Sequence, residues 1–81
     1  MPMNPLQRQC LEFLKLLREK ELSDDLIEQS CYLLMTLPLD IMGRGIDILA
    51  EYLNNQNPTE SEYRSEMSRV HKELMGYVNE K

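Results

Sequence analysis

Two cysteines and one histidine are the residues of this chain best suited to nucleophilic or metal chemistry. A Cys-His pair needs a thiol held against the imidazole, yet Cys10, Cys31 and His71 are far apart in the sequence. An antiparallel pairing of the first two helices would bring Cys10 level with Cys31, but metal sites usually need three or four ligands. The apolar neighbours of both cysteines predict that each is buried as a small hydrophobic residue. We expect no metal, no cofactor and no catalytic thiol, and we interpret His71 as a residue at the border of an apolar stripe.

Carboxylates and a glycine pair are the other candidates for chemistry. Acid-base catalysis requires a desolvated carboxyl group, but the acidic residues fall at predicted helix starts or on polar faces. Gly43-Arg44-Gly45 matches part of a GxGxxG phosphate loop, although Ile48 occupies the third glycine position and no strand precedes it. Close helix packing within the chain and the approach of a second chain at Gly45 explain these glycines equally well. We predict that the protein is not an enzyme.

Capping signals and apolar spacing predict four helices, over residues 5–20, 23–37, 39–54 and 59–79. Asn4 and Gln7 are typical of a helix start, and Ser23 is suited to cap the second helix. Pro38 interrupts the second helix because proline lacks an amide hydrogen. Residues 59–62 read Thr-Glu-Ser-Glu, which predicts a capping box at the start of the last helix.

The spacing of apolar residues predicts which faces of these helices are buried. The helix over residues 23–37 is apolar around most of its circumference and should be the most buried. The last helix has one heptad-like seam, which consists of Tyr63, Met67, Val70, Leu74 and Tyr77. The helix over residues 39–54 has a core stripe, which consists of Leu39, Met42, Ile46, Leu49, Ala50 and Leu53. Together these patterns predict an all-α fold, a compact four-helix bundle that forms a single domain over residues 1–81.

A second apolar stripe on the helix over residues 39–54 gives the candidate binding surface. Its residues recur at intervals of four, three and four, and Met75 and Tyr77 of the last helix add apolar surface. A chain of 81 residues builds only one small core, so we expect part of this stripe to contact another chain. The predicted protein interface consists of Ile41, Gly45, Ile48, Tyr52, Met75 and Tyr77.

The charge distribution narrows the class of partner. The net charge is −5, and residues 21–57 carry seven acidic residues against Arg44 alone. A recognition helix in a DNA groove faces phosphate charge, so the acidic helix over residues 39–54 fits nucleic acid poorly. The basic residues of the first and last helices are interspersed with glutamates. Nucleic acid is therefore an unfavourable partner, and a dimeric nucleic-acid-binding regulator of transcription type is the alternative function.

These observations predict a small helical protein-protein interaction or regulatory module. It would bind a second copy of itself, with a homodimer favoured, or a partner protein. A redox or metal protein that uses Cys10 and Cys31 is a third possibility. The longest apolar run is far shorter than a membrane span, and the first residues do not follow the pattern of a secretory leader. We therefore expect no membrane segment and a cytoplasmic location, which the scarcity of cysteine also favours.

Overall fold

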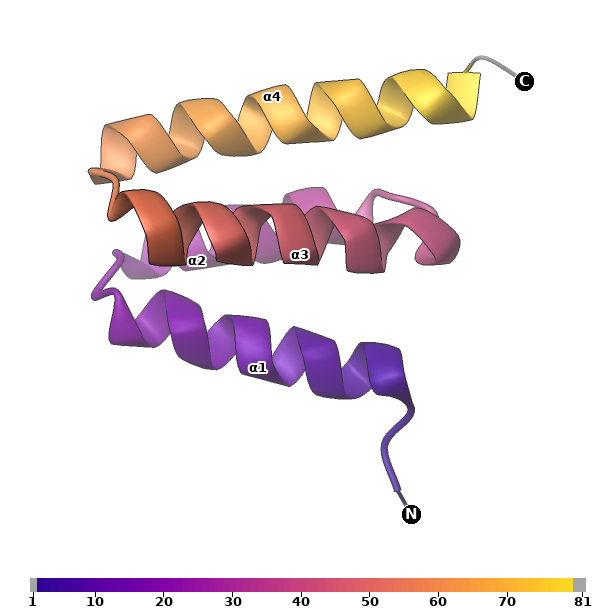
Figure 1. Cartoon of the computed structure of the whole chain (residues 1–81), viewed down its shortest axis with the longest axis horizontal. Helices are drawn as coiled ribbons and strands as arrows, with labels where there is room; N and C mark the ends of the chain where they lie inside the picture. The colour runs from indigo at the N-terminus through magenta and orange to yellow at the C-terminus, as the bar shows by residue number, and fades with distance from the viewer. Residues whose placement is uncertain (1, 80–81) are drawn as a thin grey trace.

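The computed structural model describes residues 2–79, so the two ends of the predicted domain 1–81 lie outside the described residues. Four helices fill this part of the chain, namely α1 (Pro5–Glu19), α2 (Asp24–Met35), α3 (Leu39–Gln56) and α4 (Glu60–Asn79), as Figure 1 shows. No strand occurs within residues 2–79. The predicted all-α four-helix bundle is confirmed, and each predicted helix boundary lies within two residues of the observed one.

Side-chain caps fix the starts of three helices. The Asn4 side chain accepts a hydrogen bond from the Gln7 amide at 2.8 Å, while the Gln7 side chain accepts one from the Asn4 amide at 3.0 Å. Thr59 and Glu62 form the same reciprocal pair at 3.1 and 2.9 Å, and Ser23 caps α2. Because the first amides of a helix have no partner within it, these bonds determine where each helix begins.

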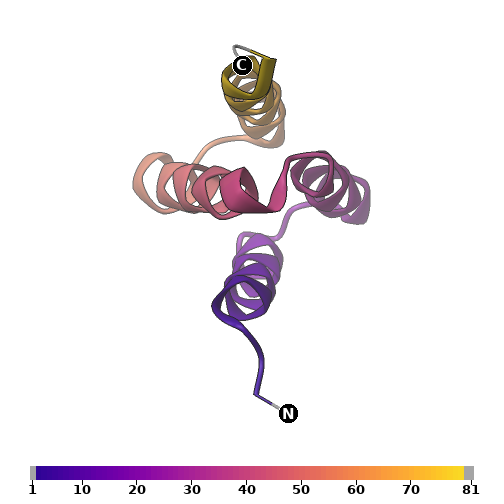
Figure 2. The same cartoon turned by 90° about the vertical axis from the view of Figure 1, so that its right-hand side faces the viewer.

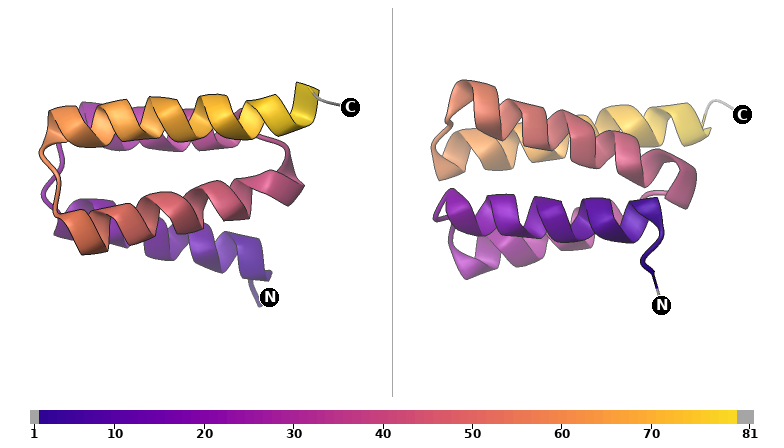
Figure 3. Two further views of the ribbon diagram at one scale, coloured as in Figure 1. Left: turned by 45° about the horizontal axis from the view of Figure 1, so that its top comes forward. Right: turned by 60° about the horizontal axis from the view of Figure 1, so that its bottom comes forward.

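Consecutive helices run antiparallel, and α2 and α3 occupy the middle of the bundle. Figure 2 shows α1 and α4 on opposite sides of the α2 and α3 pair. In the left view of Figure 3, α4 lies alongside α2 and α3 alongside α1, whereas in the right view α3 lies alongside α4 and α1 alongside α2; each of these pairs is in contact. Within the described residues, α1 contacts α2 and α3 but not α4, whereas α2 and α3 each contact all three other helices.

The core runs through the whole length of the bundle. The first four residues of the predicted α4 seam are buried, as expected, whereas Tyr77 is exposed. Tyr63 is fully buried, and its hydroxyl oxygen lies 3.1 Å from the Ser30 hydroxyl oxygen. The Ser30 hydroxyl donates a hydrogen bond to the Leu26 carbonyl. Burial raises the pKa of Tyr63 to about 12. The buried apolar side chains are Phe13, Leu17, Leu26, Leu34, Leu37, Met42, Ile46, Leu49, Leu53, Tyr63, Met67, Val70 and Leu74.

Two predictions about the burial of α2 and α3 are wrong. The helix expected to be the most buried, α2, exposes Tyr32 and Met35, whereas α3 has more buried residues than α2. Leu39, predicted to lie in the core, is 71% exposed. Helical periodicity gives the angle of a residue around the helix axis but not whether a neighbouring helix covers that level. Leu39 is the first residue of α3, beside the turn at Pro38, and is not covered.

Candidate functional site

The six residues predicted to bind a partner lie on α3 and α4, two helices that pack against each other. Gly45 is buried in the core. A methyl group in place of its hydrogen would meet the side-chain ends of Leu34, Leu37 and Leu74 at 3.1–3.2 Å. The close approach expected at Gly45 is therefore made by other parts of the same chain.

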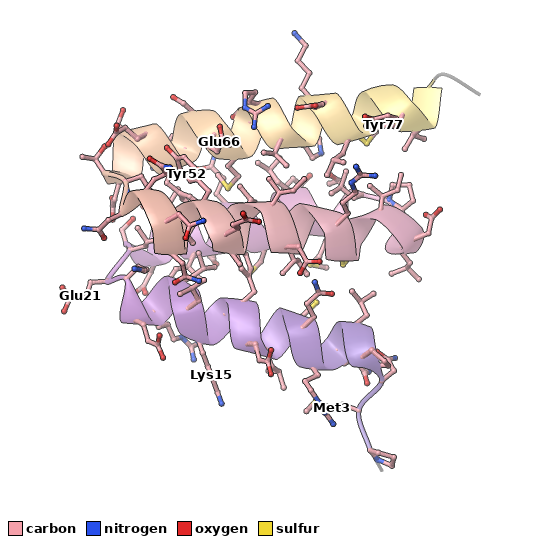
Figure 4. The ribbon with its side chains drawn as sticks, in the orientation of Figure 1. Met3, Lys15, Glu21, Tyr52, Glu66 and Tyr77 are labelled. Carbon is pink, nitrogen blue, oxygen red and sulfur yellow. The ribbon has the colours of Figure 1, made fainter. Side chains whose placement is uncertain are left out.

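The other five residues of this predicted interface keep some exposed surface. Tyr52 lies beside α4 (Figure 4), where partial burial and then the carboxylates of Glu62 and Glu66 raise the pKa of its phenol. Tyr77 is 52% exposed, and the Arg44 guanidinium lies 5.9 Å from the centre of its ring. The half-buried members, which pack against the core, are Ile41, Ile48, Tyr52 and Met75. Much of this surface is used in packing within the chain, and its use in binding stays a prediction.

Both cysteines line a single apolar hollow between α1, α2 and α3. Its volume is about 210 Å³, and every residue that lines it is apolar or a cysteine. Cys10 lies level with Cys31, as the antiparallel pairing of α1 and α2 predicts. The prediction that both cysteines are buried is wrong, because Cys10 is exposed and Cys31 is half-buried. The lining residues are Cys10, Leu11, Phe13, Leu14, Cys31, Leu34, Met35, Met42 and Ile46.

A wider groove of about 670 Å³ continues from this hollow along the outer side of α2. It shares Leu14, Cys31 and Met35 with the hollow and adds Tyr32. The side chains of Leu11, Tyr32 and Met35 are 46%, 68% and 74% exposed. We name this surface the α1–α2 face, which consists of Cys10, Leu11, Leu14, Cys31, Tyr32 and Met35.

The sequence carries a signal for the α1–α2 face, although it predicts that both cysteines of this face are buried. Leu11 and Leu14 are three residues apart, and Cys31 and Met35 are four apart, so each pair lies on one side of its helix. The same spacing is typical of a buried stripe. Only the position of the neighbouring helices shows that these two stripes meet at the surface.

Charged residues of opposite sign flank the α1–α2 face. Arg18 follows Leu14 by one turn of α1, while Asp25 and Glu28 lie on α2 and line the groove. All three are exposed. The salt bridges found within residues 2–79 join Arg69 to Glu66 and Glu73 on α4, so the charges beside this face have no salt-bridge partner in the described chain.

The Cys31 thiol of the α1–α2 face is poorly suited to act as a nucleophile. Burial, then the neighbouring Cys10, raises the pKa of the Cys31 thiol, and Arg18 partly opposes this effect. A raised pKa disfavours the thiolate, which is the nucleophilic form. His71 lies elsewhere, between α2 and α4, where its Nε2 is 2.7 Å from the Thr36 hydroxyl oxygen. Among the described residues, no group of three or more His, Cys, Asp or Glu side chains is arranged to hold a metal ion.

A second open groove, between α1 and α3, is lined by both polar and apolar residues. Its volume is about 460 Å³, and Glu12, Glu19 and Asp47 are among the residues that line it. The Gln9 amide crosses this groove and donates hydrogen bonds to the Gly43 carbonyl at 2.9 Å and to Asp47 at 2.7 Å. These bonds fasten α1 to α3, so this groove is held by contacts within the chain.

Within residues 2–79, no helix combines the length and the apolar character that a membrane crossing needs. Comparison of the chain with protein-family models, with curated proteins and with solved structures finds no match.

Proposed function

We propose that this protein is a small, non-enzymatic interaction module that associates with a second copy of itself through the α1–α2 face. The observation that carries the proposal is the gathering of Leu11, Tyr32 and Met35, all strongly exposed, around a connected apolar hollow and groove. A continuous apolar patch of this kind on a small protein is typical of a contact surface. It replaces the stripe on α3 as the best-supported surface.

The size of the α1–α2 face limits the dimer contact that it provides. A stable interface covers about 800 Å² on each partner, and the whole described chain exposes 5795 Å². Helix α1 has 15 residues and is therefore about 22 Å long, and two packed helices are about 20 Å wide. A face of these dimensions measures about 440 Å² in projection, roughly half of a standard interface, so α1 and α2 alone provide a small dimer contact.

The distribution of charge gives less support to the alternative of a nucleic-acid-binding regulator. The basic side chains lie mainly on α1 and α4, which are on opposite sides of the bundle (Figure 2). On α4, Arg69 is paired with Glu66 and Glu73. Phosphate recognition favours basic residues that share one face, and this arrangement divides them.

A cytoplasmic location belongs to our proposal, because unpaired cysteines are typical of a reducing compartment.

The proposal is tested by the solution mass of the wild type, of Met35→Glu and of Ile48→Glu, measured by light scattering with circular dichroism of each sample. We expect a wild-type dimer. Met35→Glu should be a folded monomer, because this side chain is 74% exposed and a charge there opposes burial against a second chain. Ile48→Glu should lose helical signal, because Ile48 packs against the core.

Two results would count against the α1–α2 face. If the wild-type protein stays monomeric at high concentration, the proposed self-association is wrong. A folded, monomeric Ile48→Glu beside a dimeric Met35→Glu would return the contact surface to the α3 stripe predicted from the sequence.

A further inference from the structure

The flanking charges of the α1–α2 face divide it into a basic half and an acidic half. Arg18 stands at the end of α1 nearest the turn into α2, and Asp25 and Glu28 stand at the matching end of α2. Because α1 and α2 run antiparallel, these three residues are close to one level of the hairpin. Arg18 follows Leu14 of this face by one turn of α1, so the two residues share one side of the helix.

We infer that two copies join through this face about a twofold axis that runs parallel to α1 and α2, so that α1 of each copy packs on α2 of the other. This inference rests on the proposed function and specifies its geometry. In a twofold dimer of stacked faces the axis lies in the plane of the interface. It runs either along the helices or across them, and the two cases place different residues opposite one another.

A twofold axis along the helices keeps each residue at the same position along the helix direction and places α1 of one copy opposite α2 of the other. Arg18 then meets Asp25 and Glu28 of the second copy, twice in the dimer. An axis across the helices places α1 on α1 and α2 on α2 and reverses the positions along the helices, so that Arg18 lies opposite the start of the second copy's α1 and meets neither Asp25 nor Glu28. Opposite charges across an interface guide association and fix its register, whereas like charges oppose it. The charge layout therefore selects the first case.

The inferred geometry also places the two thiols. Cys10 and Cys31 line the same hollow and thus share a level. With α1 on α2, Cys10 of one copy faces Cys31 of the other, and two Cys10 residues are separated by the width of the face. The apolar centre, which includes Leu14 and Met35, closes over the hollow from both sides.

The test is a charge exchange between two variants, Arg18→Glu and Glu28→Lys. Each variant alone places like charges across the interface and should weaken its own dimer on the order of tenfold in Kd. An equal mixture should form heterodimers with an affinity near that of the wild type. In such a heterodimer the introduced glutamate of one variant meets the introduced lysine of the other, and the unchanged Arg18 and Glu28 meet at the second contact. Analytical ultracentrifugation of the two variants and of the mixture measures this. Both side chains are exposed, so the fold of each variant should be unchanged.

A second measurement reports geometry without relying on affinity. Cys10→Ser is mixed with Cys31→Ser, and diamide is added, which takes up the two protons and two electrons released when two thiols form a disulfide. A disulfide-linked dimer should form in the mixture and not in either variant alone.

The outcomes separate the two proposals. If affinity is not restored in the mixture, the axis along the helices is wrong while self-association still holds. The same conclusion follows if Cys31→Ser alone gives Cys10–Cys10 crosslinks. A wild-type chain that is monomeric throughout overturns both. Restored affinity together with crosslinking only in the mixture supports the inferred dimer.

Discussion

Replacing Gly45 by alanine measures how tightly the middle of α3 is packed, and thus whether this part of the predicted binding stripe is available to another protein. The new methyl group would lie 3.1–3.2 Å from carbon atoms of Leu34, Leu37 and Leu74. These three side chains are 3–6% exposed and come from different parts of the bundle, so they have little room to move together. Adding a methyl group to a full core costs about 1–3 kcal/mol.

Gly76→Ala is the matched control, because a methyl group there would meet no atom within 4 Å. Both glycines lie within helices, where alanine is favoured over glycine by about 1 kcal/mol. Since this gain is common to both substitutions, the difference between them isolates the packing cost at Gly45. We expect Gly76→Ala to stabilise the fold by up to about 1 kcal/mol and Gly45→Ala to be less stable than Gly76→Ala by about 1–3 kcal/mol.

Urea unfolding followed by circular dichroism, with all samples at one protein concentration, measures this difference. For a chain of this size each kcal/mol also shifts the melting temperature by about 4–8 °C. If Gly45→Ala stabilises the protein as much as Gly76→Ala does, the space around Gly45 is open. That result would refute the packing described here and would favour the α3 stripe as a docking surface.

Three further predictions concern the fold that supports the face. Between pH 10 and about 12 Tyr63 is ionised in the unfolded chain but neutral in the folded chain. The wild type should therefore lose roughly 2–3 kcal/mol of stability relative to Tyr63→Phe over this range. Urea unfolding that shows the same loss of stability in both proteins would contradict this. Thr59→Ala removes the cap of α4 and should cost about 1 kcal/mol, whereas Ser61→Ala, in the same exposed turn, should change stability by less than about 0.5 kcal/mol. Leu39→Ala should be neutral within about 0.5 kcal/mol, and Leu49→Ala should cost about 2–5 kcal/mol, a contrast that thermal melts would reveal.

The helices themselves follow from local signals, which is why their positions were predictable. The Asn4 and Gln7 pair and the Thr59 and Glu62 pair each satisfy backbone groups within one turn, and no distant residue is needed. The end of α2 was less predictable. Pro38 indicates only that the helix cannot continue through residue 38. Helix α2 in fact ends at Met35, and Thr36 is its C-cap residue.

Burial depends on which helices are neighbours, and this explains the misplaced residues. Cys10 and Met35 belong to apolar stripes whose spacing is the same as that of a core stripe. Their exposure follows from the packing of α1, which contacts α2 and α3 but not α4. A single sequence does not show which pairs of helices are in contact, so helical spacing alone did not separate the core from the α1–α2 face.

The excess of apolar surface on α3 has a different cause from the one its sequence suggested. Helix α3 contacts three other helices, so a wide apolar surface is needed for packing within the chain alone, and the side left over carries exposed Asp40, Asp47 and Glu51. Helix α2 also contacts three helices, yet its remaining side carries Tyr32 and Met35. Two helices with the same number of neighbours thus differ in what they leave open to solvent. Because apolar side chains on such a side gain nothing from packing within the chain, the unused apolar surface of α2, and not the wide stripe of α3, argues for a second molecule.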